Sequence, residues 1–153
     1  MFMLYNIISI IIYNFKGRLL MTRKQARKEA FILIFEKQFS SDELQDILDI
    51  AKQVRDINPD EYITKVFFGV YDNIETIDKI ISEMAVGWSI KRISKTALAV
   101  LRLAIFEMKF MDDIPVSVSI NEAVELTKKY ATKDDASFVN GILATVSKQV
   151  ENA

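Results

Sequence analysis

The chain has 153 residues, of which 50% are hydrophobic and 27% are charged, a composition that excludes wholesale disorder. Its 20 Lys and Arg against 21 Asp and Glu give a net charge of −1, so any nucleic-acid binding must come from a local patch. The absence of Cys and His excludes disulfides and thiolate metal sites, and it removes the commonest general base and transition-metal ligand.

The segment Met1–Leu20 differs in composition from the rest of the chain. It has two cations and no acid, and its interrupted apolar run is shorter than the roughly 20 residues of a membrane helix. A basic segment before the apolar run and a small-residue cleavage site are both missing, which disfavours a signal peptide. Polar, helix-forming sequence starts afresh at Met21. We therefore expect residues 1–20 to be an upstream extension outside the working protein and residues 21–153 to form the folded domain. A weak membrane tether and a swapped packing strand are the alternatives.

From residue 22 onward the pattern predicts successive helices. Apolar residues recur at intervals of three and four, and only three Gly and two Pro interrupt them. No stretch alternates as a half-buried strand does. The sequence therefore predicts about seven helices with short connections. The expected segments are Thr22–Phe39, a helix after a capping box at Ser40–Glu43, a helix after Asn58-Pro59, Ile74 to Gly87, Ile93–Phe110, a helix ending at Tyr130, and a helix from the Thr132 cap to about Val150.

Several residues of these segments are expected to have structural roles. The residues assigned to the core are Trp88, Leu101, Ile105, Phe106 and Leu126. Asn121 and Asn140 are expected to be buried, hydrogen-bonded struts between helices. Gly141 lies inside a helix, where it costs ~1 kcal/mol relative to Ala, so a close approach of two helices is expected there.

The sequence gives little support for catalysis. The four glycines are far apart, so no phosphate-cradling loop is present, and no base with an orienting partner accompanies a Ser or Lys nucleophile. The paired acids Asp112-Asp113 and Asp134-Asp135 are explained by a turn and by a helix start. We therefore expect no enzyme, no catalytic residue, no cofactor, no metal and no small-molecule substrate.

A basic cluster opens the first predicted helix. It consists of Arg23, Lys24, Arg27 and Lys28, which lie off the apolar stripe of that helix. Positive charge at a helix N-terminus opposes the macrodipole, so helix stability alone would not select it. One interpretation is a solvated charged face, and the other is contact with nucleic-acid phosphates.

Five blocks of sequence make the chain recognisable. They are Arg23–Ala30 together with Trp88, Leu101–Met108, Asp113–Pro115, Ile120–Leu126 and Phe138–Leu143. In order and spacing they resemble the NusB family of bacterial transcription antitermination factors, over essentially all of residues 21–150. The blocks INEAVEL and FVNG are specific in combination.

The resemblance implies an all-α fold of two small packed helical bundles and a non-enzymatic, cytoplasmic RNA-binding role without membrane contact. Family members bind the single-stranded boxA element of ribosomal RNA leaders together with NusE, a protein of the small ribosomal subunit. The pair joins NusA and NusG on RNA polymerase and suppresses premature termination.

The resemblance also implies site residues. RNA contact at the first helix carries over to Arg23, Lys24 and Arg27, with Lys28 in the same cluster. At the start of the last helix it carries over to Asp134 and Phe138. Relatives often have Arg at the position of Gln25. The cations would neutralise phosphates. Phe138 either stacks on an unpaired base or belongs to the core, and Asp134 either caps its helix or accepts a hydrogen bond from a base edge.

Two other interpretations come from different functional classes. The N-terminal RNA-binding module of a ribosomal RNA cytosine methyltransferase is similar to NusB, but that enzyme needs a large cofactor-binding domain with a Gly-rich loop. A helical scaffold that binds only protein is the third possibility, against which the basic cluster argues.

Overall fold

The computed structural model describes residues 21–152, so the predicted extension at residues 1–20 lies outside the described part, as does residue 153. Within the described range the chain forms seven α-helices and one short 3₁₀ helix, without a strand, which confirms the all-α prediction. The elements are α2 (Arg23–Lys37), α3 (Leu44–Arg55), α4 (Glu61–Asp72), α5 (Ile74–Met84), η1 (Ile90–Arg92), α6 (Lys95–Phe110), α7 (Val116–Tyr130) and α8 (Lys133–Glu151). None of the helices in this range is both long and apolar enough to cross a bilayer.

Helix starts follow local capping, with two corrections. Ser94 and Thr132 each accept a hydrogen bond from the backbone N–H three residues later. The predicted Asn58 cap is wrong by two residues, because Asp60 accepts the N–H of Ile63 instead. The predicted capping box at Ser40 is also wrong. The Ser40 hydroxyl bonds within its own turn to Asp42, and α3 begins too late for Ser40 to reach it.

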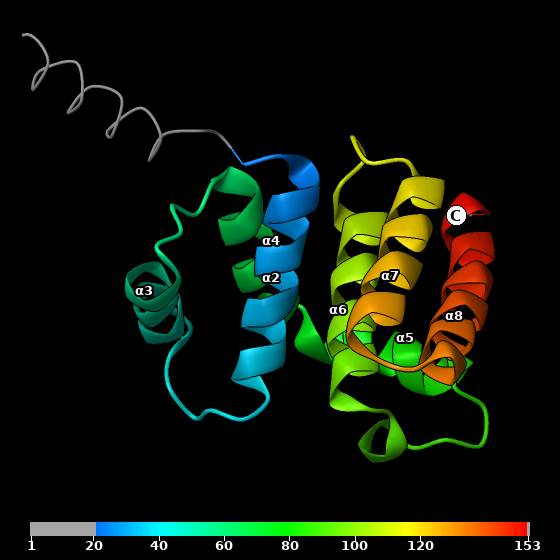
Figure 1. Ribbon diagram of the computed structural model, residues 1–153. Coiled ribbons are helices and arrows are strands. Elements are labelled where there is room, and N and C mark those ends of the chain that lie inside the picture. The colour runs from blue at the N-terminus through cyan, green and yellow to red at the C-terminus, as the bar shows by residue number, and fades with distance from the viewer. Residues whose placement is uncertain (1–20, 153) are drawn as a thin grey trace, which may run out of the picture.

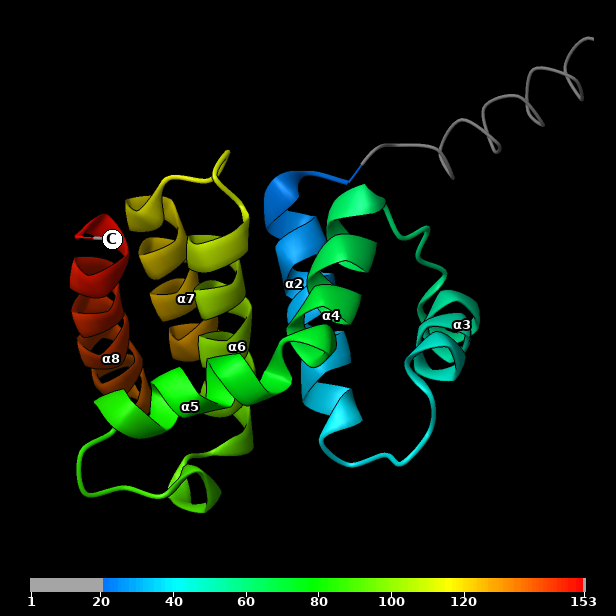
Figure 2. The same cartoon turned by 180° about the vertical axis from the view of Figure 1, so that it is seen from behind.

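The helices form two bundles, as predicted. One contains α2, α3 and α4, and the other contains α5, α6, α7 and α8 (Figures 1 and 2). Helix α6 is central, since every residue from Ala97 to Met108 is buried, and it packs against α2 and α4 of the first bundle as well as against α7 and α8. The joint between the bundles is therefore the contact of α2 and α4 with α6.

The core assignments hold for Leu101, Ile105 and Phe106, and Leu126 is partly buried against the core. The assignment of Trp88 is wrong. Its side chain is 56% exposed, in the segment that joins α5 to η1. A loop residue does not belong to a helix face that packs on the core. The apolar residue type of Trp88 was therefore not sufficient to predict its burial.

The predicted polar struts and the predicted close approach are also wrong. Asn121 and Asn140 are exposed, and nothing lies within 4 Å of a Cβ added at Gly141. Asn140 follows the buried Val139 by one position, which turns it about 100° away from the core. The close approach occurs at Gly69 instead, where the ring of Phe106 occupies the place of a Cβ.

Candidate nucleic-acid interface

The first turn of α2 is fixed by a reciprocal capping box. The Thr22 hydroxyl accepts the N–H of Gln25 at 3.2 Å, and the Gln25 side-chain oxygen accepts the N–H of Thr22 at 2.9 Å. Gln25 thus has a structural role, as the second partner of the capping box. No acid lies in this turn, so no carboxylate within the turn offsets the charges of Arg23 and Lys24.

Arg27 does not belong to the exposed cluster, which corrects the prediction that all four cations lie off the buried stripe. Its side chain is buried, with its guanidinium clamped on Glu107 of α6. The Nε and Nη2 groups donate to the two carboxylate oxygens at 2.9 and 2.8 Å. Burial would lower the pKa of Arg27, but hydrogen bonds and attraction from Glu107 outweigh it and raise that pKa. Arg27 is therefore charged and engaged inside the protein.

The partner of Arg27 was missed by sequence reasoning. Glu107 is fully buried within the apolar run of α6, and a buried carboxylate requires a cation or several donors. A lone acid within the long apolar run of α6 was the signal that could have found this pair. Glu122 of α7 adds a weaker contact to Arg27, at 3.8 Å.

Arg23 is exposed but has a fixed neighbour. Its guanidinium carbon lies 4.4 Å from the ring centroid of Tyr62 on α4, a cation–π distance. Burial, followed by the repulsion of Glu107, raises the pKa of Tyr62, so its hydroxyl stays neutral. The ring face therefore holds Arg23 in place and leaves its outward N–H groups available for an anion.

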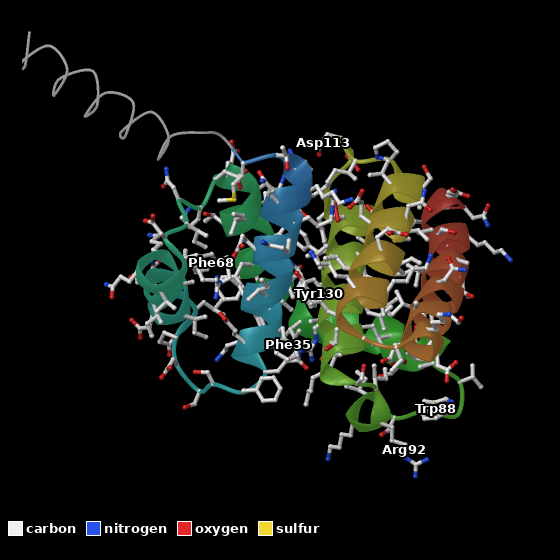
Figure 3. The ribbon with its side chains drawn as sticks, in the orientation of Figure 1. Phe35, Phe68, Trp88, Arg92, Asp113 and Tyr130 are labelled. Atoms are coloured by element: carbon white, nitrogen blue, oxygen red, sulfur yellow. The ribbon has the colours of Figure 1, made fainter. Side chains whose placement is uncertain are left out.

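Lys24 and Lys28 line a groove of about 410 Å³ between α2 and α7. Lys24 is exposed, and Lys28 is half-exposed with its Nζ 3.3 Å from Glu29. The α7 wall of the groove adds Lys129 and Tyr130, together with Glu122 and Glu125. Tyr130 lies toward α2, where its ring centroid is 5.4 Å from that of Phe31 (Figure 3). Lys129 is a cation of this surface that the sequence analysis did not select.

Asp134 and Phe138 lie elsewhere, in the first two turns of α8, so the structure does not bring them into the groove of the cations. They line a separate pocket of about 220 Å³, together with residues of the α5–α6 connection. Thr132, not Asp134, caps the helix, and Asp134 is exposed. Phe138 is half-buried and packs partly against the core.

The end of α7 lies between the groove lined by Lys24 and Lys28 and the start of α8. Lys128 and Lys129 occupy its last turn, and Lys133 opens α8 after a short connection. Lys128 and Lys133 share a further groove of about 470 Å³ between α7 and α8. Cations thus run from the start of α2, across the end of α7, to the start of α8. Within residues 21–152, no group of three or more acids is placed to hold a metal ion.

Comparison with known proteins matches this architecture. The NusB family model matches residues 24–148. The transcription antitermination protein NusB of Acetivibrio thermocellus is 44% identical over 130 residues, which cover 84% of this chain and 90% of that protein. The protein of the same name from Ruminiclostridium cellulolyticum is 42% identical with the same coverage.

Solved structures agree. NusB of T. maritima superposes with a TM-score of 0.76 at 32% identity, covering 86% of this chain and 94% of that one. A structure of the antitermination factors NusB and NusE in complex with double-stranded RNA gives 0.76 at 28% identity, covering 83% and 96%. The chain belongs to the NusB family.

Proposed function

We propose that this chain is an RNA-binding transcription antitermination factor. It binds the single-stranded boxA element of ribosomal RNA leaders together with NusE, and with NusA and NusG it helps RNA polymerase read through terminators. The protein acts in the cytoplasm and is not an enzyme.

The observation that carries the proposal is the exposed charge at the start of α2. Arg23 and Lys24 lie at a helix N-terminus without an acid in the first turn, and neither forms an ion pair within the described residues. Helix dipole and cations act in the same direction there, and both attract phosphate. The surface thus favours an anionic ligand at the expense of local helix stability.

Within this proposal the four cations have different roles. Arg23, Lys24 and Lys28 contact phosphates, and Lys129 extends their surface along the groove. Arg27 holds α2 against α6 through Glu107 and so fixes the direction of the helix that presents the other cations. Asp134 and Phe138 contact the RNA farther along the strand.

The relatives favour this role over a methyltransferase module, because the matched proteins are NusB factors covered over about nine-tenths of their length or more. A scaffold that binds only protein would not require unpaired cations at the start of α2. The RNA in the neighbouring complex is double-stranded, so a duplex competitor belongs in the test.

The test is RNA binding by the full chain, with and without NusE. Three phosphate contacts give a log–log salt slope of roughly −2, at about −0.7 per contact for a single strand. In the double variant Lys24→Glu/Lys28→Glu we expect the affinity to fall at least about tenfold and the slope to become shallower. The double variant Lys52→Glu/Lys79→Glu reverses two exposed cations of α3 and α5 that do not line this groove, and it is the charge-matched control.

Three outcomes would contradict the proposal: a slope near zero, equal affinity of the double variant, or preference for the duplex competitor. NusE binding without any RNA binding would favour the scaffold instead.

A further inference from the structure

Trp88 is an exposed aromatic residue without an explanation in the fold. It is the only tryptophan of the chain, and it follows Gly87, whose φ of +81° turns the segment between α5 and η1. Its side chain is 56% exposed although indole is among the most costly groups to leave in water. Figure 3 places Trp88 and Arg92 at the end of the bundle where α8 begins.

The exposed ring borders a small pocket. Trp88, Arg92, Ile93 and Ser94 form one wall of this 220 Å³ space, and Asp134, Asp135 and Phe138 of α8 form the other. Two aromatic side chains from separate elements thus line one cavity, which has room for one planar ring system but not for a protein helix. Any nucleobase can stack on an aromatic side chain, because every base has a π face.

The positive and negative charges around the pocket lie on opposite walls. Arg92 is exposed and forms no ion pair among the described residues, so its guanidinium is available for a phosphate. The opposite wall carries the carboxylates of Asp134 and Asp135, which repel phosphate and accept hydrogen bonds but cannot donate them. A bound nucleotide would therefore direct its backbone toward Arg92 and its base edge toward α8.

We propose that Trp88 and Phe138 clamp one unpaired nucleobase, with Arg92 on the adjacent phosphate. The clamp favours adenine, cytosine or guanine over uracil. Their exocyclic amino groups donate to the acceptor-only wall, whereas the single ring N–H of uracil lies between two carbonyl oxygens that the carboxylates repel. This inference rests on the proposed function and adds to it a second aromatic face and a base preference.

The single tryptophan provides a direct test. The full chain is titrated with boxA RNA while tryptophan emission and the anisotropy of labelled RNA are followed in parallel. We expect emission to be quenched with the same midpoint as the anisotropy change. Trp88→Ala should weaken binding about tenfold at an unchanged salt slope, and Trp88→Phe should restore most of the affinity.

Two further variants separate charge from stacking. Arg92→Ala should make the salt slope shallower by about 0.7, the value of one phosphate contact. Val86→Ala is the matched control, because Val86 is exposed on the same segment but does not line the pocket, and it should bind like the wild type.

Base preference is tested by replacing one base of the RNA at a time with its analogue lacking the amino group, namely inosine, nebularine or zebularine. One replacement should lower wild-type affinity about fivefold, the loss of one hydrogen bond, and should have no effect on Trp88→Ala. Equal effects in both proteins would overturn the base preference.

The outcomes distinguish the two proposals. RNA binding with unchanged tryptophan emission and full affinity of Trp88→Ala would overturn the clamp and leave the RNA-binding function intact. Loss of NusE affinity in Trp88→Ala, with RNA affinity unchanged, would assign the pocket to protein and also overturn the clamp. No binding of RNA under any condition would overturn both.

Discussion

The first turns of α2 and α8 are capped in the same way but carry net charges of opposite sign. In each, a threonine hydroxyl accepts the N–H of the residue three positions later, Thr22 from Gln25 and Thr132 from Asp135. The first turn of α8 then carries two acids, Asp134 and Asp135, beside the single cation Lys133, and the macrodipole favours this net negative charge. The first turn of α2 carries two cations and no acid. The helix dipole explains the acids at the start of α8 but not the cations at the start of α2. We therefore attribute the cations of α2 to binding of an external anion.

Arg27 is an exception in that comparison, because this cation of α2 stabilises the fold. Removing one member of a buried ion pair leaves the other charge unpaired, so Arg27→Ala or Glu107→Ala should lower the free energy of unfolding by about 3–5 kcal/mol. Urea denaturation measures this effect, which is the largest that we expect.

The double variant Arg27→Met/Glu107→Leu is the control, since it removes both charges and retains apolar volume. It should recover most of the lost stability. Single variants as stable as the wild type would return Arg27 to the exposed cluster and to direct RNA contact.

The two threonine caps should prove equivalent. Thr22→Ala and Thr132→Ala each leave one N–H of the first turn without its acceptor and should each lower the free energy of unfolding by about 1 kcal/mol. Thermal melts of the two variants, with Thr64→Ala on the exposed face of α4 as a reference, check this. A much larger loss at one end would show that the two turns are not alike and would remove the basis of the comparison.

Local signals predicted far more of this molecule than distant ones. The Thr132 cap depends on residues three positions apart, and the sequence alone was sufficient to find it. The Arg27–Glu107 pair joins residues 80 positions apart, so only the packing of α2 on α6 reveals it. The roles of Asp134 and Phe138 came from family resemblance, and no local pattern would have placed Trp88 beside them.

The smallest expected effect tests the comparison most directly. Lys24→Glu replaces an unfavourable charge in the first turn of α2 with a favourable one, so the free energy of unfolding should rise by about 0.3–1 kcal/mol. The mirror change, Asp134→Asn in the first turn of α8, should lower it by a similar amount. Both are measured by urea denaturation at low ionic strength, where screening is weakest. If Lys24 is retained for binding, Lys24→Glu gains stability while its affinity for boxA RNA falls, and salt diminishes both effects. A variant that is more stable and binds RNA as well as the wild type would mean that the opening cations of α2 serve neither stability nor RNA binding.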